Sequence, residues 1–120
     1  MSPQEVKLFE PITSLKMFVY GVTGVGKTPL AGSWGPDAFV YFLDAEGGYH
    51  SLEYLGSSFC GQIVTGVRSF ITVRAVLDAL IYKDAARWPK GVPQPTQRPD
   101  VVVVDSLTAE HLKDSPYPAL

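Results

Sequence analysis

The sequence is poor in cysteine and has neither long apolar runs nor a strong excess of one charge. A single cysteine, Cys60, excludes an intramolecular disulfide and a thiolate metal cluster, and is typical of a reducing, cytoplasmic compartment. The apolar stretches at 17–20, 38–43 and 101–104 are far too short to span a bilayer. Residues 1–10 lack the uninterrupted apolar segment of a secretion signal. We therefore expect a cytoplasmic protein with no membrane partner.

Size and charge set further limits. Ten Lys and Arg against twelve Asp and Glu give a formal charge of −2, so net charge does not indicate a nucleic-acid or membrane surface. With 120 residues, 46% of them hydrophobic, the chain can bury one core. The sequence predicts a single domain over residues 1–120. Its expected irregular parts are an N-terminal extension (1–13), a proline-rich loop (88–99) and a tail (110–120) that starts a helix and frays.

Strand and helix patterns alternate along the chain. The run at 38–43 is continuously apolar, as in a strand covered on both faces of a parallel sheet. From Ser69, a plausible N-cap, apolar residues recur at helical spacing to about Lys83. This alternation predicts an α/β fold with a mainly parallel sheet. The expected strands are 15–20, 38–43, 62–65 and 101–104, and the expected helices begin at Lys27, Tyr49 and Ser69.

A glycine-rich octet lies between the first expected strand and the first expected helix. It matches the phosphate-binding loop, or Walker A pattern, at every fixed position. Its glycines let backbone amides converge on phosphate oxygens, Lys27 reaches the β- and γ-phosphates, and Thr28 offers its hydroxyl to Mg²⁺. The sequence therefore predicts ATP and Mg²⁺ as ligands; the alternative is a glycine-rich turn of chance composition. The octet is Gly21, Val22, Thr23, Gly24, Val25, Gly26, Lys27 and Thr28.

Pro29 is a departure directly after the octet. It removes one backbone donor and disfavours the helical conformation of Thr28. We expect Pro29 to weaken the hold on the phosphates without abolishing it.

Two apolar strands end in aspartate, and either carboxylate could hold the water shell of Mg²⁺. Asp105 follows the more uniform strand, so we assign it to the metal. Glu46 follows Asp44 in a glycine-flanked loop and is assigned to polarise the attacking water, with Asp44 in support. The alternative for Asp44 and Glu46 is a turn with a solvated acid.

These motifs together resemble a known family. Phe39 to Glu46 (FVYFLDAE) looks like the segment of RecA and RadA recombinases in which a strand ends in Asp-Ala-Glu and the glutamate is the catalytic base. Val101 to Ser106 (VVVVDS) is similar to the second nucleotide motif of that family. The combination, over Leu15 to Leu107, resembles most closely the short RecA-like ATPases of bacteriophages, many of them recombination or single-strand annealing proteins.

The resemblance implies more than nucleotide binding. It implies a three-layer P-loop NTPase fold, an ATPase acting in phage-type DNA recombination or annealing, single-stranded DNA as a partner, and a homo-oligomer. The family's strands and polar sensor that follow the second motif have no counterpart after Ser106, so a truncated or minimal core is expected. The alternatives are an ATP-dependent binding or assembly module with little turnover, and a small-molecule P-loop kinase.

Basic and aromatic side chains give weaker indications. Ordinary solvated surface is the favoured interpretation of the basic residues, and core or interface packing that of the aromatics, against stacking on bases. His50, beside the Asp-Ala-Glu loop, is a candidate phosphate sensor or a surface residue, and His111 is a weaker candidate. The basic residues are Arg68, Arg74, Lys83, Arg87, Lys90 and Arg98, and the aromatics are Trp34, Tyr49, Tyr54, Trp88 and Tyr117.

Overall fold

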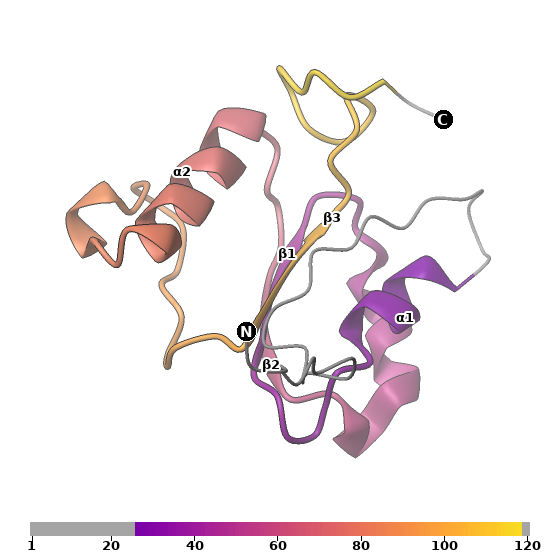
Figure 1. Cartoon of the computed structure of the whole chain (residues 1–120). Helices are drawn as coiled ribbons and strands as arrows, with labels where there is room; N and C mark the ends of the chain where they lie inside the picture. Colours follow the sequence, from indigo (N-terminus) through magenta and orange to yellow (C-terminus); the bar gives the residue numbers. More distant parts are fainter. Residues whose placement is uncertain (1–25, 119–120) are drawn as a thin grey trace, which may run out of the picture.

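The sheet consists of three short parallel strands (Figure 1). The computed structural model describes residues 26–118, so the expected strand at 15–20 and octet residues 21–25 lie outside the described residues. The strands are β1 (Val40–Asp44), β2 (Gly61–Val64) and β3 (Val101–Asp105). The α-helices are α1 (Lys27–Gly32) and α2 (Phe70–Ile81), and the 3-10 helices are η1 (Gly48–Ser58) and η2 (Ala85–Arg87).

Strand β1 lies in the middle of the order β2-β1-β3. Its register places Val40 opposite Gly61 on one side and Val101 on the other, and Asp44 opposite Asp105. Every residue of β1 is buried, because the strand has neighbours on both edges and helices on both faces. This burial explains why its sequence is continuously apolar rather than alternating. The small α/β fold with a parallel sheet agrees with the sequence prediction.

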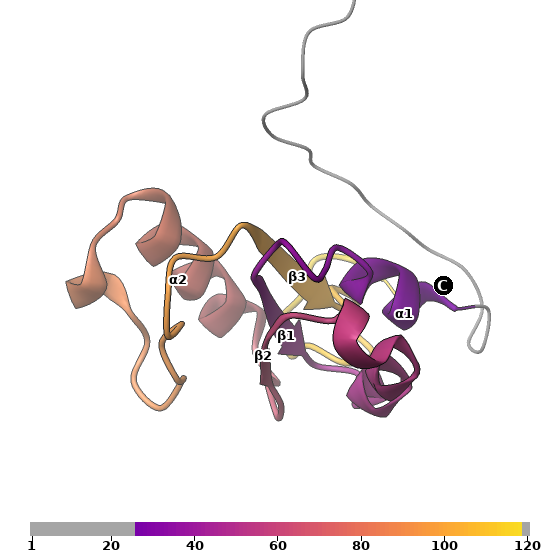
Figure 2. The same cartoon turned by 90° about the horizontal axis from the view of Figure 1, so that it is seen from below.

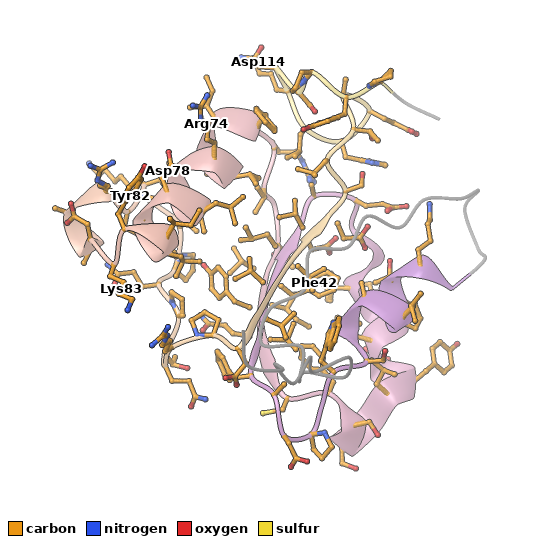
Figure 3. The ribbon with its side chains drawn as sticks, in the orientation of Figure 1. Phe42, Arg74, Asp78, Tyr82, Lys83 and Asp114 are labelled. Carbon is orange, nitrogen blue, oxygen red and sulfur yellow. The ribbon has the colours of Figure 1, made fainter. Side chains whose placement is uncertain are left out.

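The described residues form three layers, with α2 on one face of the sheet and α1 and η1 on the other (Figures 1 and 2). Tyr41 and Leu43 pack towards α2 in a core that includes Val76. Val40 and Phe42 form the other core with Leu52 of η1, and Figure 3 shows Phe42 on the side of the sheet that faces α1. Successive residues of β1 thus supply both cores.

Several expected boundaries need correction. The helix predicted from Tyr49 is a longer 3-10 segment that continues past Gly56, whose φ of 52° interrupts it. Ser69 is the N-cap of α2 as predicted, but its side chain makes no capping hydrogen bond. The helix ends at Ile81, before Lys83, which takes a left-handed φ of 53°.

The segment after β3 has no helix within residues 106–118, so the predicted helical start at 110 is wrong. It is held instead by isolated bridges that join Ser69 to Lys113 and Thr108 to Tyr117. Leu112 is fully buried in the core beneath α2. Apolar burial rather than helical hydrogen bonding therefore holds this irregular tail on the domain.

The proline-rich loop is irregular, as predicted, but it also packs on the sheet. Trp88 meets Tyr41 edge to face at 5.9 Å between ring centroids, and the Tyr41 hydroxyl donates a hydrogen bond to the carbonyl oxygen of Pro93. Burial raises the pKa of Tyr41 to about 12, so the hydroxyl remains a donor at neutral pH. Among residues 26–118, no helix has the length and apolarity needed to cross a membrane.

Candidate functional site

The site is centred on a contact between the start of α1 and the end of β3. The Thr28 hydroxyl donates a hydrogen bond to Asp105 Oδ2 at 2.6 Å, across 77 residues of sequence. Asp105 is 8% exposed, so its carboxylate keeps little water of its own. The contact is charge-assisted, which explains its short length. It joins the last residue of the octet to the aspartate that ends the valine-rich strand.

Local backbone geometry places Lys27 and Thr28 at the beginning of α1. Gly26 precedes the helix with φ 92° and ψ 20°, a left-handed conformation that favours glycine. The carbonyl oxygen of Gly26 accepts a hydrogen bond from the Leu30 amide at 3.1 Å, which closes the first turn. Pro29 lies inside that turn, and Thr28 is helical despite it.

A tight loop after β1 carries Glu46 to the same edge of the sheet. The buried Asp44 carboxylate accepts hydrogen bonds from the amides of Gly47 at 2.9 Å and Tyr49 at 3.2 Å. The amides of Ala45 and Glu46 both donate to the Asp105 carbonyl oxygen, at 2.7 Å and 3.0 Å. Asp44 therefore shapes the loop, and the end of β3 fixes it in place.

The Glu46 carboxyl lies in the electrostatic field of Asp105. Burial is the main cause that raises the pKa of Glu46, and a hydrogen bond to Asp105 and the negative charge of Asp105 raise it further. His111 and Lys27 lower it, so both basic side chains act on the same carboxyl. A carboxylate with a raised pKa is a stronger proton acceptor, which suits it to polarise water.

Two residues at this edge, His111 and Arg68, were undervalued by sequence reasoning. Ser106 Oγ lies 2.7 Å from Nδ1 of His111, which brings His111 to the cluster. Arg68 donates from Nη1 to the Ala45 carbonyl oxygen at 2.8 Å and so braces the loop of Glu46. No local pattern marks either residue; only the fold of the segments that follow β2 and β3 brings them there.

Other candidates lie away from the cluster. His50, the proposed phosphate sensor, has a side chain that is 70% exposed and lies 3.8 Å from Glu53. Tyr49 stacks on His50, and Tyr117 packs against Phe70, in line with the packing interpretation of the aromatics. Tyr54, by contrast, is 90% exposed.

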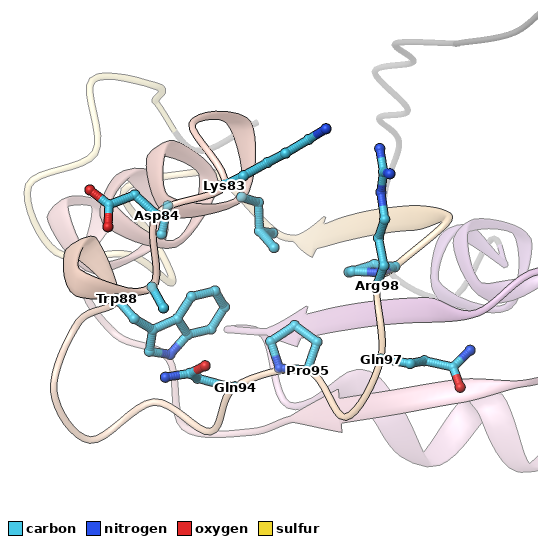
Figure 4. A pocket seen from close by; sticks show the side chains of 11 residues that line it. Lys83, Asp84, Trp88, Gln94, Pro95, Gln97 and Arg98 are labelled. Carbon is cyan, nitrogen blue, oxygen red and sulfur yellow. The ribbon is translucent and has the colours of Figure 1, made fainter.

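A hollow of about 410 Å³ lies elsewhere, between the end of α2, η2 and the proline-rich loop. Trp88, Gln94 and Pro95 are among the residues that line it (Figure 4). Residues 94–99 precede β3, so the hollow is at the amino end of that strand, whereas Asp105 is at the carboxyl end. Parallel sheets bind ligands beyond the carboxyl ends of their strands. The hollow is therefore separate from the candidate site.

The donor set at the carboxyl edge fits a hard divalent cation. Mg²⁺ prefers oxygen ligands and usually keeps waters, with one or two carboxylates and substrate phosphates. A hydroxyl and a carboxylate oxygen face each other here, at Thr28 and Asp105. Residues 26–118 hold no group of three or more His, Cys, Asp or Glu that could bind a metal, and this mode of Mg²⁺ binding requires none.

The structure thus brings together four of the predicted site residues, Lys27, Thr28, Glu46 and Asp105, at one edge of the sheet. Residues Gly21 to Val25, the rest of the predicted phosphate-binding loop, lie outside the described residues. Comparison with protein-family models, with curated proteins and with solved structures gave no match. The class that the described residues define is a small α/β domain with a three-stranded parallel sheet.

Proposed function

We propose that the chain is a RecA-like P-loop ATPase domain that binds Mg-ATP and hydrolyses it to ADP and phosphate. The observation that carries the proposal is the hydrogen bond from Thr28 to Asp105. In P-loop NTPases the hydroxyl of the loop and the aspartate at the end of a strand serve the same Mg²⁺ ion. The glycine-rich octet and the valine-rich strand were recognised separately in the sequence. Their residues Thr28 and Asp105 meet where such an ion would bind both.

Each residue at the edge has a role in the proposed reaction. Lys27 would offset negative charge on the β- and γ-phosphates, and Thr28 and Asp105 would hold the cation. Bound Mg²⁺ would neutralise negative charge on the phosphates. Glu46 orients water for in-line attack and accepts its proton, which its raised pKa favours. Asp44 and Arg68 keep the Glu46 loop in position through backbone hydrogen bonds.

The biological task that we propose rests on the resemblance of the motifs to phage RecA-like proteins. It is DNA recombination or annealing on single strands, in the cytoplasm of a bacterial host, by a homo-oligomer. The second candidate is a module that binds ATP with little turnover, and the presence of Pro29 within the first turn of α1 favours it.

A phosphate-release assay with Mg-ATP, run with and without single-stranded DNA, tests the proposal. Release that DNA stimulates supports the recombinase. Absence of release with retained ATP binding supports the binding module, and transfer to an added acceptor supports a kinase. In the ATPase, Glu46→Gln slows release by about 100-fold or more while ATP binding persists. The matched control is Glu53→Gln, which alters an exposed glutamate in η1 and leaves release unchanged.

A further inference from the structure

The outer face of α2 carries apolar and charged side chains, several of which are largely exposed; Arg87 lies over the Tyr82 ring at 4.6 Å from its centroid. Ile71, Ile81 and Tyr82 are 66%, 70% and 63% exposed, although all three are large and apolar. Figure 3 shows Arg74, Asp78 and Tyr82 along the side of α2 that faces away from the sheet. Ile71, Arg74, Asp78 and Ile81 are three or four residues apart, so they share one stripe of the helix.

The stripe is symmetric about its middle. Ile71 and Ile81 lie five residues before and after Val76, and Arg74 and Asp78 lie two residues before and after it. An antiparallel copy of the helix, related by a two-fold axis that crosses the outer face at the level of the buried Val76, therefore sets Arg74 opposite Asp78 and Ile71 opposite Ile81. Each contact occurs twice, which is the property of an isologous interface.

The two charges are available for such a contact. Within residues 26–118, neither the Arg74 guanidinium nor the Asp78 carboxylate makes a hydrogen bond or an ion pair through its side chain. Their order along the helix, with the cation four residues before the anion, is the less favourable one for pairing within one helix. Pairing between Arg74 of one helix and Asp78 of an antiparallel partner helix does not depend on this order.

We propose that the outer face of α2 binds a second copy of the chain, with the two α2 helices antiparallel and crossing at the level of Val76. The partner is a second copy because the stripe is complementary to itself. Arg74 of one copy meets Asp78 of the other, and Ile71 of one copy meets Ile81 of the other. Another partner protein would need no such symmetry. The sheet lies against the inner face of α2, so a partner contacts only the outer face of this helix (Figures 1 and 2).

The interface is small, because one twelve-residue helix supplies most of it from each copy. Interfaces of this size lie at the weak end of the range, so we expect a dissociation constant on the order of 100 µM. The dimer does not depend on nucleotide, because the stripe shares no residue with the Thr28–Asp105 site. Failure of the dimer and failure of the ATPase proposal are thus separate outcomes.

Charge exchange tests the proposal by sedimentation equilibrium up to about 1 mM protein. Arg74→Asp and Asp78→Arg each place like charges opposite one another, so each weakens the dimer at least about tenfold. The double variant R74D/D78R restores the dimer, because both pairs re-form with exchanged signs. Lys90→Asp makes the same charge change as Arg74→Asp at an exposed residue of the proline-rich loop and leaves the dimer intact.

Circular dichroism verifies that each variant is folded before sedimentation. A parent chain that stays monomeric at every concentration overturns the proposal. So does a single variant that dimerises as well as the parent, or a double variant that fails to recover the dimer.

Discussion

Asp44 and Asp105 have the same sequence context, an apolar strand that ends in aspartate, but their contacts differ. Asp44 accepts amide hydrogen bonds from Gly47 in its loop and from Tyr49 at the start of η1, and it is 1% exposed. Asp105 receives the Thr28 hydroxyl and influences the pKa of Glu46. At the scale of single residues, Asp44 is therefore a positioning residue for the loop, and Asp105 is the carboxylate that faces the proposed ligand.

Replacing Glu46 with Gln should stabilise the metal-free protein at neutral pH. Because the pKa of Glu46 is raised in the fold, the folded state holds its proton more tightly than the unfolded state, and stability falls as pH rises through the folded pKa. Glu46→Gln removes that loss, so the thermal midpoint at pH 7 in EDTA rises above that of the parent. The difference disappears below the ordinary pKa of a glutamate, about 4.3.

Scanning calorimetry at several pH values measures this difference. Glu53→Gln is the control, because the Glu53 side chain is 81% exposed and its replacement should leave the midpoint unchanged at every pH. A Glu46→Gln variant that is less stable than the parent at pH 7 would contradict the electrostatic description of the cluster.

Removing the Thr28 hydroxyl should destabilise the domain even without nucleotide. Thr28→Val keeps the shape of the side chain but leaves the Asp105 carboxylate without its 2.6 Å donor. Hydrogen bonds to charged groups are worth about 1.5–3 kcal/mol, so we expect the free energy of unfolding in urea to fall by about 1–2 kcal/mol. Thr28→Ser retains the donor and most of the stability. Equal stability of Thr28→Val and the parent would count against the contact.

At the scale of elements, β1 organises the domain. Its two edges pair with β2 and β3, and its alternate side chains enter two different cores. The helix α2 contributes Val73 and Val76 to one core, and its periodic apolar residues made it predictable. The 3-10 segment η1 was predicted less well. Gly47 and Gly56 adopt positive φ angles, which the spacing of apolar residues does not reveal.

The edge between β1 and β2 depends on the absence of a side chain at Gly61. A Cβ atom there would lie 2.1 Å from the carbonyl oxygen of Val40, an atom of the backbone that cannot rotate away. Gly61→Ala should therefore lower the free energy of unfolding by about 1–3 kcal/mol. Urea denaturation measures the loss, with Thr65→Ala, at an exposed residue just beyond β2, as the neutral control. An unchanged midpoint for Gly61→Ala would contradict the observed register.

At the scale of the whole molecule, local patterns predicted the described strands and the parallel α/β class. Continuous apolar runs marked β1 and β3, because buried parallel strands need no polar face. The order β2-β1-β3 was not predicted, because no local pattern encodes which strand lies beside which. The burial of Leu112 and the approach of His111 to Ser106 also depend on how the tail folds back. The spacing of residues along the sequence does not predict long-range contacts of this kind.

The candidate site was likewise predicted in part from local motifs and completed by contacts that only the fold creates. Motif chemistry selected Lys27, Thr28, Glu46 and Asp105, and the fold brings these residues to one edge of the sheet. Arg68 was classed with the solvated basic residues and His111 was only a weak candidate, because a lone basic side chain carries no pattern of its own. Their contacts with Ala45 and Ser106 arise only after β1 and β3 are paired.

Calorimetric titration of the folded chain with Mg-ATP tests the central claim most directly, namely that the octet and the carboxyl edge of the sheet hold a magnesium nucleotide. We predict measurable heat of association for the parent and an affinity at least about tenfold lower for Lys27→Ala. Absence of heat from well-folded parent protein, or equal affinity in Lys27→Ala, would contradict the claim.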